Sequence, residues 1–497
     1  MKYDYDLLVI GGGAAGLTVA SGAAQLGAKV ALVSKDRLGG DCLFFGCVPS
    51  KTLIKSAKIA HTLQTAEKYG IKSAKPHYDF ADVKRRIDDV IATAGIHDDP
   101  QRFRDMGVDV IFGKADFWDM HRVSIHLTKS LEKEQQPEFT EQGNDFCLSA
   151  KQIVIATGSR PFVPPIPGMM ESGFLTNETI FSMDKMPASL AVLGAGPIGC
   201  ELAQAFARLG AKVTLLVRSG QILSKEDPDV AEYLARILCE EGVDIRYHTE
   251  LTQVQNRRAG KVLTLKKAGA TEELEAENIL VATGRVSDLK PLHLDRAGVE
   301  SDKGGIKTDR RLRTNKKHIY AIGDVNGKYQ FTHTAGYEGG IVVSNAILGL
   351  PRKVDYEAIP WATFTDPEVA SCGLNETEAK ERGVQYQVWT HAFERQDRAL
   401  AESETSGFVK ILTTGHRGKI IGGQIVGPHA GELIHELIIA RNAGMTLASL
   451  ASAVHVYPTL AEIIKTAAGK YFSEKLFTNR TRKILKKLYG YRGKGGQ

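Results

Sequence analysis

The chain has 497 residues, of which 43% are hydrophobic and 25% charged, values typical of a soluble globular protein of roughly three domains. The formal net charge is +6, but residues 474–497 alone sum to +7 and the rest of the chain sums to −1. Because the rest of the chain has no basic excess, nucleic-acid binding is not expected. No apolar run is long enough for a transmembrane helix, and the N-terminus does not resemble a signal peptide. The six cysteines, four of them scattered singly, favour the cytoplasm over an extracellular disulfide framework.

The first predicted elements are a strand over residues 7–10, a glycine loop over 11–16, a helix over 17–26 and a strand over 29–33. A glycine fingerprint between a strand and a helix is typical of a dinucleotide-binding site. Gly11 permits the tight turn, Gly13 lets a pyrophosphate approach the backbone, and Gly16 lets helix and strand pack closely. The N-terminus of the helix then offers free N–H groups to the anion.

The pair Cys42 and Cys47 follows, within a segment rich in glycine and apolar residues. It could be a buried pair, a metal site or a working disulfide. On an ideal helix five residues rotate the chain by roughly 140°, so the two side chains would not face each other. They can bond only across an irregular first helical turn, which Gly46 and Pro49 permit. A thiolate there gains from the helix N-terminus and from Lys51, whereas a zinc site would need two more ligands that are not evident.

Further along, the polar residues 128–147 predict an exposed hairpin or loop. The strand–glycine–helix–strand unit then recurs, with strands at 190–193 and 212–217 and the fingerprint Gly194-Ala195-Gly196-Pro197-Ile198-Gly199 between them. Two such units in one chain predict two bound dinucleotides. Short strands that close on glycine precede Thr157-Gly158, Thr283-Gly284 and Gly323-Asp324, and from residue 351 alternating strands and helices predict a last domain.

The residue at the end of the second strand of each unit indicates which nucleotide binds. In the second unit Val217 stands where NAD-type sites carry an acid, and Arg218 follows at once, with Lys225 downstream. An arginine can grip a 2′-phosphate that an acid would repel, so NADPH is favoured over NADH, unless Arg218 is merely an exposed charge. In the first unit the corresponding residue is Ser34, whose hydroxyl can bind a ribose less strongly than a carboxylate.

Together these elements resemble the flavin-dependent pyridine nucleotide–disulfide oxidoreductases over residues 4–473, most specifically at Gly40-Asp41-Cys42 and Gly46-Cys47-Val48-Pro49-Ser50-Lys51. The resemblance implies an α/β fold with two Rossmann-like dinucleotide-binding domains, for FAD and NAD(P), and a C-terminal α+β dimerisation domain. The expected boundaries are 1–160 with 285–350 for FAD, 161–284 for NAD(P)H, 351–473 for the dimer interface and 474–497 for a basic tail.

By the same resemblance, electrons pass from NADPH to FAD and on to a Cys42–Cys47 disulfide, with Cys47 next to the flavin and Cys42 attacking the substrate. Asp324 would bind the ribityl chain of the flavin, and Lys51 would lie beside the flavin and pair with Glu201. The implied cofactor-binding residues are Gly11, Gly13, Ala15, Gly16, Ser34, Lys51, Thr157, Gly158, Asp324, Gly194, Gly196, Gly199, Arg218, Lys225 and Gly284, and no metal-binding residues are predicted.

The sequence departs from the family at the expected proton-shuttling histidine, which in thiol–disulfide members comes from the partner subunit of a dimer. Here Tyr457 precedes Pro458, in a frame that keeps Glu462. A tyrosine, with an ordinary pKa of about 10, is a poor proton shuttle at neutral pH. Mercuric reductases also use a tyrosine there, so Tyr457 favours a metal ion over a disulfide substrate. His455 is a possible substitute base, and no cysteine follows Cys372 to deliver a metal ion.

Three functional hypotheses follow. The leading one is a homodimeric NADPH-dependent flavoenzyme that reduces a metal ion, or a small disulfide or electrophile, with Cys42, Cys47, Lys51, Glu201, Tyr457 and Glu462 as catalytic residues. A dihydrolipoamide dehydrogenase is the alternative within enzymes. The third is a flavin redox module that serves a membrane partner, because the tail mixes basic and apolar residues at near-helical spacing. The alternative interpretation of this tail is an exposed, solvated chain end.

Overall fold

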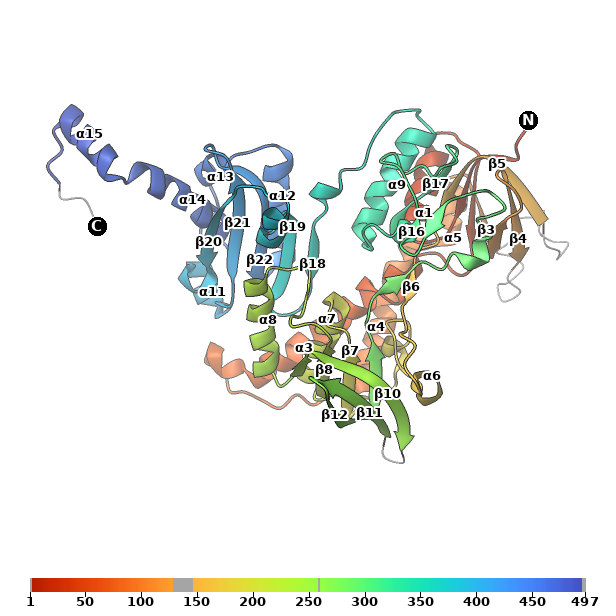
Figure 1. The fold of residues 1–497 in the computed structure, drawn as a ribbon, viewed down its shortest axis with the longest axis horizontal. Helices are drawn as coiled ribbons and strands as arrows, with labels where there is room; N and C mark the ends of the chain where they lie inside the picture. The colour runs from red at the N-terminus through yellow and green to blue at the C-terminus, as the bar shows by residue number, and fades with distance from the viewer. Residues whose placement is uncertain (1, 128–145, 258–259, 494–497) are drawn as a thin grey trace. The chain divides into compact units, whose positions relative to one another are not determined.

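The computed structural model describes residues 2–127, 146–257 and 260–493 (Figure 1). The chain divides into two compact units, one of Met1–Ala57, His77–Gly194 and Glu250–Asp355, the other of Lys58–Pro76, Ala195–Thr249 and Tyr356–Gln497. The division falls inside the second glycine fingerprint, between Gly194 and Ala195. The units therefore do not coincide with the expected domains, whose boundaries stay predictions.

The first unit is built around a sheet of six strands in the order β1-β2-β3-β4-β5-β17, with β1 also paired to β5. These strands are β1 (Tyr5–Ile10), β2 (Val30–Ser34), β3 (Val108–Phe117), β4 (Arg122–Leu127), β5 (Phe146–Ile155) and β17 (Ile319–Ala321). Apart from the exposed Asp6 and the buried Ser34, β1 and β2 consist of buried apolar residues, as expected of parallel strands covered on both faces. Because Ile10 and Ala321 both pair with Ile155 in parallel strands, β1, β5 and β17 end at one edge.

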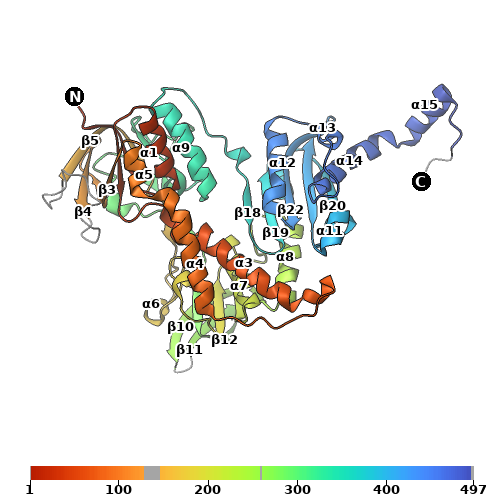
Figure 2. The same cartoon turned by 180° about the vertical axis from the view of Figure 1, so that it is seen from behind.

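Two helices pack against each other beside this sheet, α1 (Ala14–Gln25) and α9 (Thr332–Ala346) (Figure 2). The helix predicted at 17–26 thus begins three residues earlier, directly after Gly13. A Cβ atom on Gly339 of α9 would lie 3.0 Å from both Cβ and Cγ2 of Thr18. The close approach of the two helices therefore depends on a glycine at position 339.

The remaining elements of the first unit carry the loops that concern function. Its helices are α2 (Gly40–Phe44), the start of α3 (Cys47–Gln64), α4 (Phe80–Gly95), α5 (Pro100–Asp105) and α6 (Met169–Ser172). Its smaller strands are β6 (Arg160–Pro161), β7 (Ser189–Leu193), β10 (Thr249–Arg257), β11 (Gly260–Lys267), β12 (Ala270–Ala276), β13 (Asn278–Val281), β14 (Arg285–Val286), β15 (Ser301–Asp302) and β16 (Gly305–Ile306). Most of the predicted loop 128–147 lies outside the described residues; on its flanks, β4 and β5 pair antiparallel.

The second unit contains the rest of the second fingerprint and a separate antiparallel sheet. Helix α7 (Pro197–Arg208) packs on β8 (Lys212–Val217), which pairs in parallel with β9 (Asp244–Tyr247), and α8 (Pro228–Glu240) follows β8 along the chain. The strand predicted at 212–217 is confirmed.

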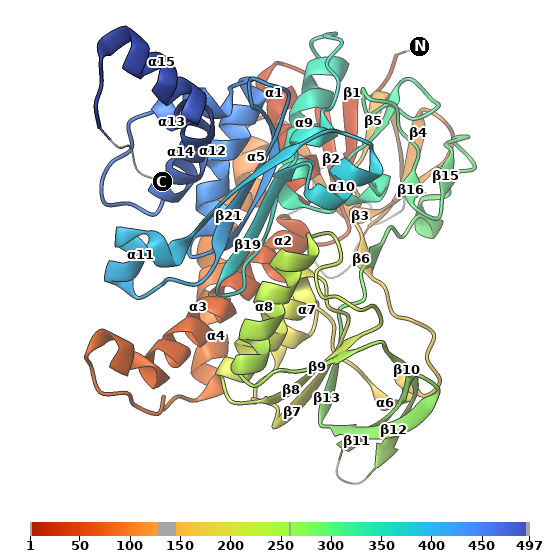
Figure 3. The same cartoon turned by 60° about the vertical axis from the view of Figure 1, so that its left-hand side comes forward.

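The antiparallel sheet has the order β18-β19-β22-β21-β20 (Figure 1), and its strands β19 and β21 are also labelled in Figure 3. Its strands are β18 (Trp361–Thr363), β19 (Glu368–Gly373), β20 (Gln387–Ala392), β21 (Phe408–Thr414) and β22 (Lys419–Gly427). The helices are α10 (Glu376–Glu381), α11 (Asp397–Glu402), α12 (Ala430–Asn442), α13 (Leu447–Ser452), α14 (Glu462–Leu476) and α15 (Asn479–Tyr489). Apolar side chains of α12, α13 and α14 form one core with the sheet. Among the described residues, no helix has the length and apolar character needed to cross a bilayer.

The packing of α1 against α9 predicts opposite effects for two adjacent glycines. Gly339→Ala places a methyl group 3.0 Å from Thr18, whereas a Cβ on the exposed Gly340 meets no atom within 4 Å. Overpacking costs about 1–3 kcal/mol, while glycine to alanine inside a helix gains up to about 1 kcal/mol. The midpoint temperature of thermal unfolding of the flavin-loaded protein should therefore fall for Gly339→Ala. For Gly340→Ala it should rise or stay unchanged. Equal midpoints for the two variants would contradict this packing.

Candidate functional site

The first glycine fingerprint forms a turn that only glycine can make at two positions. Gly11 has φ +119°, and a Cβ there would lie 2.2 Å from the carbonyl oxygen of Ala156, at the end of β5. A Cβ on Gly16 would lie 1.9 Å from the carbonyl oxygen of Gly11. Gly11 therefore permits the tight turn, and Gly16 the close packing of α1 on the turn, as expected of a dinucleotide-binding loop.

The N-termini of α1 and α7 fit the phosphate groups of two dinucleotides. Gly13 caps α1 and Gly196 caps α7, in both cases without a side-chain hydrogen bond, and neither helix has an acidic residue in its first turn. A Cβ on Gly196 would meet no atom within 4 Å, so the backbone is open to an approaching ligand. Each helix thus presents N–H groups and the positive end of its dipole to an anion, which fits the diphosphate of a dinucleotide.

The other predicted cofactor-binding residues lie at or near strand ends, or in the first turns of α1 and α7. Ser34 ends β2 and is buried with its Oγ against Gly12, where a Cβ would come within 2.6 Å. Thr157 and Gly158 follow β5, and Gly284, with φ +123°, follows β13. Ala15 and Gly199 are buried in the first turns of α1 and α7.

Asp324 lies after β17 and is held by two residues that were not predicted as site residues. Ser159 donates a hydrogen bond of 2.5 Å from Oγ to Asp324, and Arg285 donates one of 2.8 Å to Ser159 Oγ. Burial raises the pKa of Asp324 above its ordinary value, against the opposing effects of the hydrogen bond from Ser159 and the charge of Arg285. The only sequence signal for Ser159 and Arg285 was that each directly follows a Thr-Gly turn.

Arg285 also connects Asp324 to the segment that carries the cysteines. Its guanidinium lies 3.1 Å from Oδ1 of Asp41, the residue before Cys42. The side-chain amide of Asn177, which was also not predicted, donates to Asp41 Oδ1 at 3.2 Å and to the carbonyl oxygen of Phe45 at 3.1 Å. The turn around Cys42 is therefore fixed from outside by a charged and an amide side chain.

Cys42 and Cys47 lie on two helices separated by a break, whereas the sequence indicated an irregular first turn of one helix. Helix α2 ends before Phe45, and α3 begins at Cys47. A Cβ on Gly46 would lie 3.1 Å from Cys42 Cα, so the chain folds back closely only with a glycine there. Both cysteines are thiols, and Cys42 is hydrogen-bonded to Cys47. That hydrogen bond and then burial raise the pKa of the Cys42 thiol, while Thr332, 3.8 Å from Cys47 Sγ, lowers it less.

Lys51 and Glu201 are placed on different units. Lys51 lies on α3, one turn after Cys47, and is half-buried. Glu201 is buried on α7, where its carboxylate accepts a hydrogen bond of 2.8 Å from the backbone N–H of Phe364. Their pairing stays a prediction.

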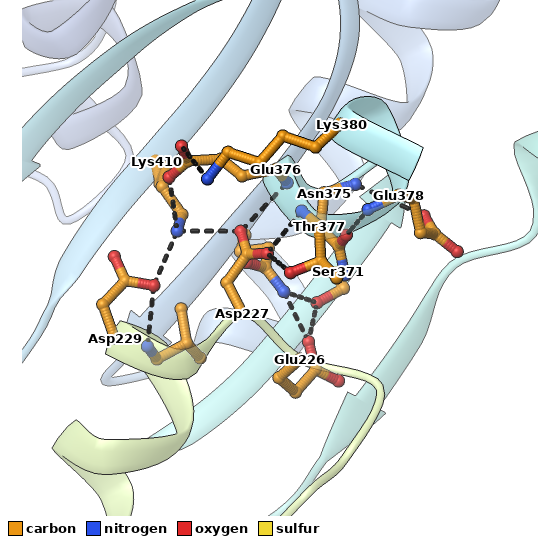
Figure 4. Close-up of polar contacts among 12 residues, drawn as sticks. Glu226, Asp227, Asp229, Ser371, Asn375, Glu376, Thr377, Glu378, Lys380 and Lys410 are labelled. Atoms are coloured by element: carbon orange, nitrogen blue, oxygen red, sulfur yellow. Dashed lines mark hydrogen bonds and ion pairs between the residues drawn. The ribbon is translucent and has the colours of Figure 1, made fainter. Parts of the chain in front are cut away.

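The predicted nucleotide-selecting residues Arg218 and Lys225 are exposed, and the loop that carries them is anchored by a buried cluster (Figure 4). Directly after Lys225, Glu226 accepts hydrogen bonds from Ser371, Gln424 and Trp361 at 2.5–2.6 Å. Burial raises the pKa of Glu226, and these hydrogen bonds oppose the shift. Asn375 also donates to the carbonyl oxygen of Lys225 at 2.9 Å.

The same cluster contains an almost fully buried lysine. Lys410, 1% exposed, lies 2.8 Å from Asp227, 2.7 Å from Asp229 and 3.2 Å from Glu376. Although burial raises the pKa of Asp227, hydrogen bonds from Lys410 and from two backbone N–H groups lower it below its ordinary value. The sequence offered no signal for this cluster, because its members are up to 184 positions apart.

Tyr457 and His455 both have partners within the second unit. The Tyr457 hydroxyl donates to Asp397 at 2.9 Å, and this hydrogen bond, with the negative charge of Asp397, raises the pKa of Tyr457. His455 lies 2.8 Å from Glu436 through Nε2 and 3.2 Å from the carbonyl oxygen of Ala453 through Nδ1. Glu462, the first residue of α14, accepts a hydrogen bond from the backbone N–H of Thr459.

These features, two dinucleotide loops and a thiol pair in the same unit as the first of them, are typical of a disulfide oxidoreductase. Residues 5–339 match the family model described as pyridine nucleotide-disulphide oxidoreductase, and residues 359–468 match its dimerisation domain. The chain belongs to this family. It is an FAD-dependent oxidoreductase that uses a pyridine nucleotide, and the expected fold class is confirmed.

Similar proteins fall into several functional groups. A mercuric reductase of Staphylococcus aureus is 34% identical over 94% of this chain and 82% of its own length. A dihydrolipoyl dehydrogenase of Geobacillus stearothermophilus is 36% identical over 93% of this chain and 95% of its own length. The Cu(II) complex of the HOCl-induced flavoprotein disulfide reductase RclA from Escherichia coli is similar in structure, with a TM-score of 0.82, 27% identity and coverage of 95% and 100%.

The cluster around Lys410 predicts a large difference between two lysines that contact the same glutamate. Lys410→Met leaves carboxylates without their buried cation, which should lower the free energy of unfolding by about 3 kcal/mol. Lys380, 3.9 Å from Glu376 and 68% exposed, is the matched control. Lys380→Met should lower the free energy of unfolding by less than about 1 kcal/mol. Both values are measured by urea titration.

The pH dependence of the Lys410→Met effect has a fixed sign. Because the pKa of Asp227 is lowered in the folded state, its contribution is present above its unfolded pKa and is lost as the pH falls. The difference between the parent protein and Lys410→Met should therefore shrink below about pH 4. A difference that stayed constant down to pH 3 would show that the pKa of Asp227 does not depend on its contact with Lys410.

Proposed function

We propose that this protein is an NADPH-dependent reductase of a thiol-binding divalent metal ion, with Hg(II) as the representative substrate, and that Cys42 and Cys47 are its redox pair. In the net reaction NADPH and Hg(II) yield NADP⁺, one proton and elemental mercury, so two electrons are transferred. The observation that carries the choice of a metal ion is the state of Tyr457, hydrogen-bonded to Asp397 with a raised pKa.

The protonation demands of the possible substrates differ. Reduction of a disulfide releases thiolates that must gain protons, so it benefits from a group that titrates near neutral pH. Tyr457 holds its proton well above that range, and His455 is already engaged by Glu436. Reduction of Hg(II) to the metal consumes no proton at the substrate. A site with a tyrosine before Pro458, in place of a histidine, is therefore better suited to the metal ion.

The cysteine pair suits a soft metal ion. Cys42 and Cys47 lie within hydrogen-bonding contact, so two thiolates can ligate one ion, and soft thiolates favour such metals. Because its pKa is raised, the Cys42 thiol keeps its proton until the neighbouring sulfur or a bound metal ion changes the local charge. The start of α3 stabilises a thiolate at Cys47.

The cofactors are held by groups already described. Gly13 and the first turn of α1 would bind the diphosphate of FAD, and Asp324, fixed by Ser159, would bind a hydroxyl of its ribityl chain. When bound, FAD supplies the hydride chemistry between the nicotinamide and the cysteine pair. Gly196 and α7 would bind the second nucleotide, and Arg218 would select NADPH through its 2′-phosphate.

The dimerisation domain supports a homodimer. We expect the segment 457–462 of one subunit to complete the active site of the other, so that Tyr457 of that segment contacts the metal ion. Dihydrolipoamide oxidation is the competing activity, because relatives with that name match as well as the mercuric reductases do.

The choice of substrate predicts a clear result in an NADPH-oxidation assay of the FAD-loaded protein. We expect turnover with Hg(II) supplied as a thiol complex, and little with glutathione disulfide or lipoamide. Cys42→Ser and Cys47→Ser should each lose at least about a hundredfold in kcat/KM for Hg(II), since covalent ligation is lost. Turnover confined to a disulfide, or full Hg(II) activity in Cys42→Ser, would contradict the proposal.

The nucleotide preference is tested separately by two cations on one strand. Arg218 follows the carboxyl end of β8, whereas Lys212 is exposed at the opposite end. Arg218→Ala should raise KM for NADPH by about tenfold or more and leave KM for NADH unchanged, because only NADPH carries the 2′-phosphate. Lys212→Ala should change neither value. Equal effects of Arg218→Ala on both nucleotides would mean that it does not read the phosphate.

A further inference from the structure

The C-terminal helix α15 is capped locally at both ends. Its N-cap Thr478 accepts a hydrogen bond from the backbone N–H of Thr481 at 3.1 Å, and Gly490 ends the helix with φ +67°. None of its residues is buried. The helix is therefore specified by its own caps and presents most of its surface to solvent.

The side chains of α15 separate into an apolar and a basic face. At about 100° per residue, with Ile484 at zero, Leu488 lies at about 40°, Leu485 at about 100° and Tyr489 at about 140°. Every basic residue falls on the remaining arc, between about 160° and about 320°. These basic residues are Arg480, Arg482, Lys483, Lys486 and Lys487. A one-sided distribution of this kind is the mark of a helix that lies at an interface.

The apolar face is open, and its edges carry the arginines. Ile484, Leu488 and Tyr489 are 47%, 67% and 65% exposed, and Phe477, just before the helix, is 69% exposed. Arg482 lies next to Tyr489 at one edge of the apolar arc, and Arg480 lies next to Ile484 at the other. Long basic side chains at such edges can extend their charges toward phosphate groups while the apolar residues insert between them.

We propose that α15 docks this enzyme on an anionic phospholipid surface, with the helix lying in the plane of the headgroups. Charge supports a lipid occupant, because residues 475–497 contain no acid and residues 474–497 carry +7 against −1 for the rest of the chain. Attraction to an anionic surface is thus concentrated at the helix that also exposes the apolar residues. The helix lies beyond residue 468, where the dimerisation-domain match ends.

The experiment is co-sedimentation of the FAD-loaded full chain with two kinds of vesicle. One kind contains phosphatidylcholine alone, and the other also contains roughly 30 mol% of the anionic lipid phosphatidylglycerol. We expect binding to the anionic vesicles, weakened by salt. The triple substitution of Lys483, Lys486 and Lys487 to Gln should weaken it by about fivefold for each lysine removed. Ile484→Ser with Leu488→Ser should abolish it at unchanged charge, since apolar insertion is lost.

A matched control separates the helix from net charge. Substituting the exposed Lys266, Lys267 and Lys303 to Gln removes the same charge from another part of the chain and should leave vesicle binding unchanged. Equal weakening by both triple variants, or absence of binding to anionic vesicles at low salt, would overturn the proposal. So would tail variants that change the mass of the protein assembly in solution without affecting vesicle binding, because the occupant would then be a second copy.

The docking proposal does not depend on the substrate. All tail variants should keep the flavin content and the NADPH-oxidation rate of the parent protein in solution, which also shows that they fold. Failure of Hg(II) turnover with intact vesicle binding would reject only the proposed function, and the reverse result would reject only the docking.

Discussion

The contact between Cys42 and Cys47 depends on the interruption of the helix at Phe45 and Gly46. On a continuous helix the two sulfurs would point in different directions. The break is held by Asn177 on the carbonyl oxygen of Phe45 and by Arg285 on Asp41. Through Arg285 and Ser159 the same network reaches Asp324, at the edge where β1, β5 and β17 end. The thiol pair and the segment that carries Asp324 are therefore positioned by one set of contacts within the first unit.

In the second unit the predicted nucleotide-selecting residues are exposed, while the residues that anchor their loop are buried. Arg218 and Lys225 lie in solvent, but the residues after them, Glu226 and Asp227, are held by a network around Lys410. Such an arrangement lets an exposed loop stay accessible without losing its position. Tyr457 is different, because its hydroxyl is exposed and its single described partner is Asp397. The hydrogen bond to that carboxylate, and its charge, raise the pKa of the phenol.

The fold could be predicted largely from the sequence because its signals are local. The glycine fingerprints, the break at Gly46 and the strands that end in Thr-Gly turns each lie within a few consecutive residues. The contacts that support them could not be predicted in this way. Arg285 meets Asp41 across 244 positions, and Lys410 meets Asp227 across 183. Only the pairing of strands and the packing of helices bring such residues together, and a single sequence does not encode these distances in any short pattern.

The measurement that tests the redox pair most directly is differential alkylation of the cysteines, read by mass spectrometry without oxygen. In the oxidised protein Cys42 and Cys47 should resist alkylation, and both should react after NADPH is added. One equivalent of Hg(II) should then protect both again. The exposed Cys147 and Cys239 should react throughout, as internal controls. Equal labelling of Cys42 and Cys47 before and after NADPH would contradict the assignment of this pair as the redox centre.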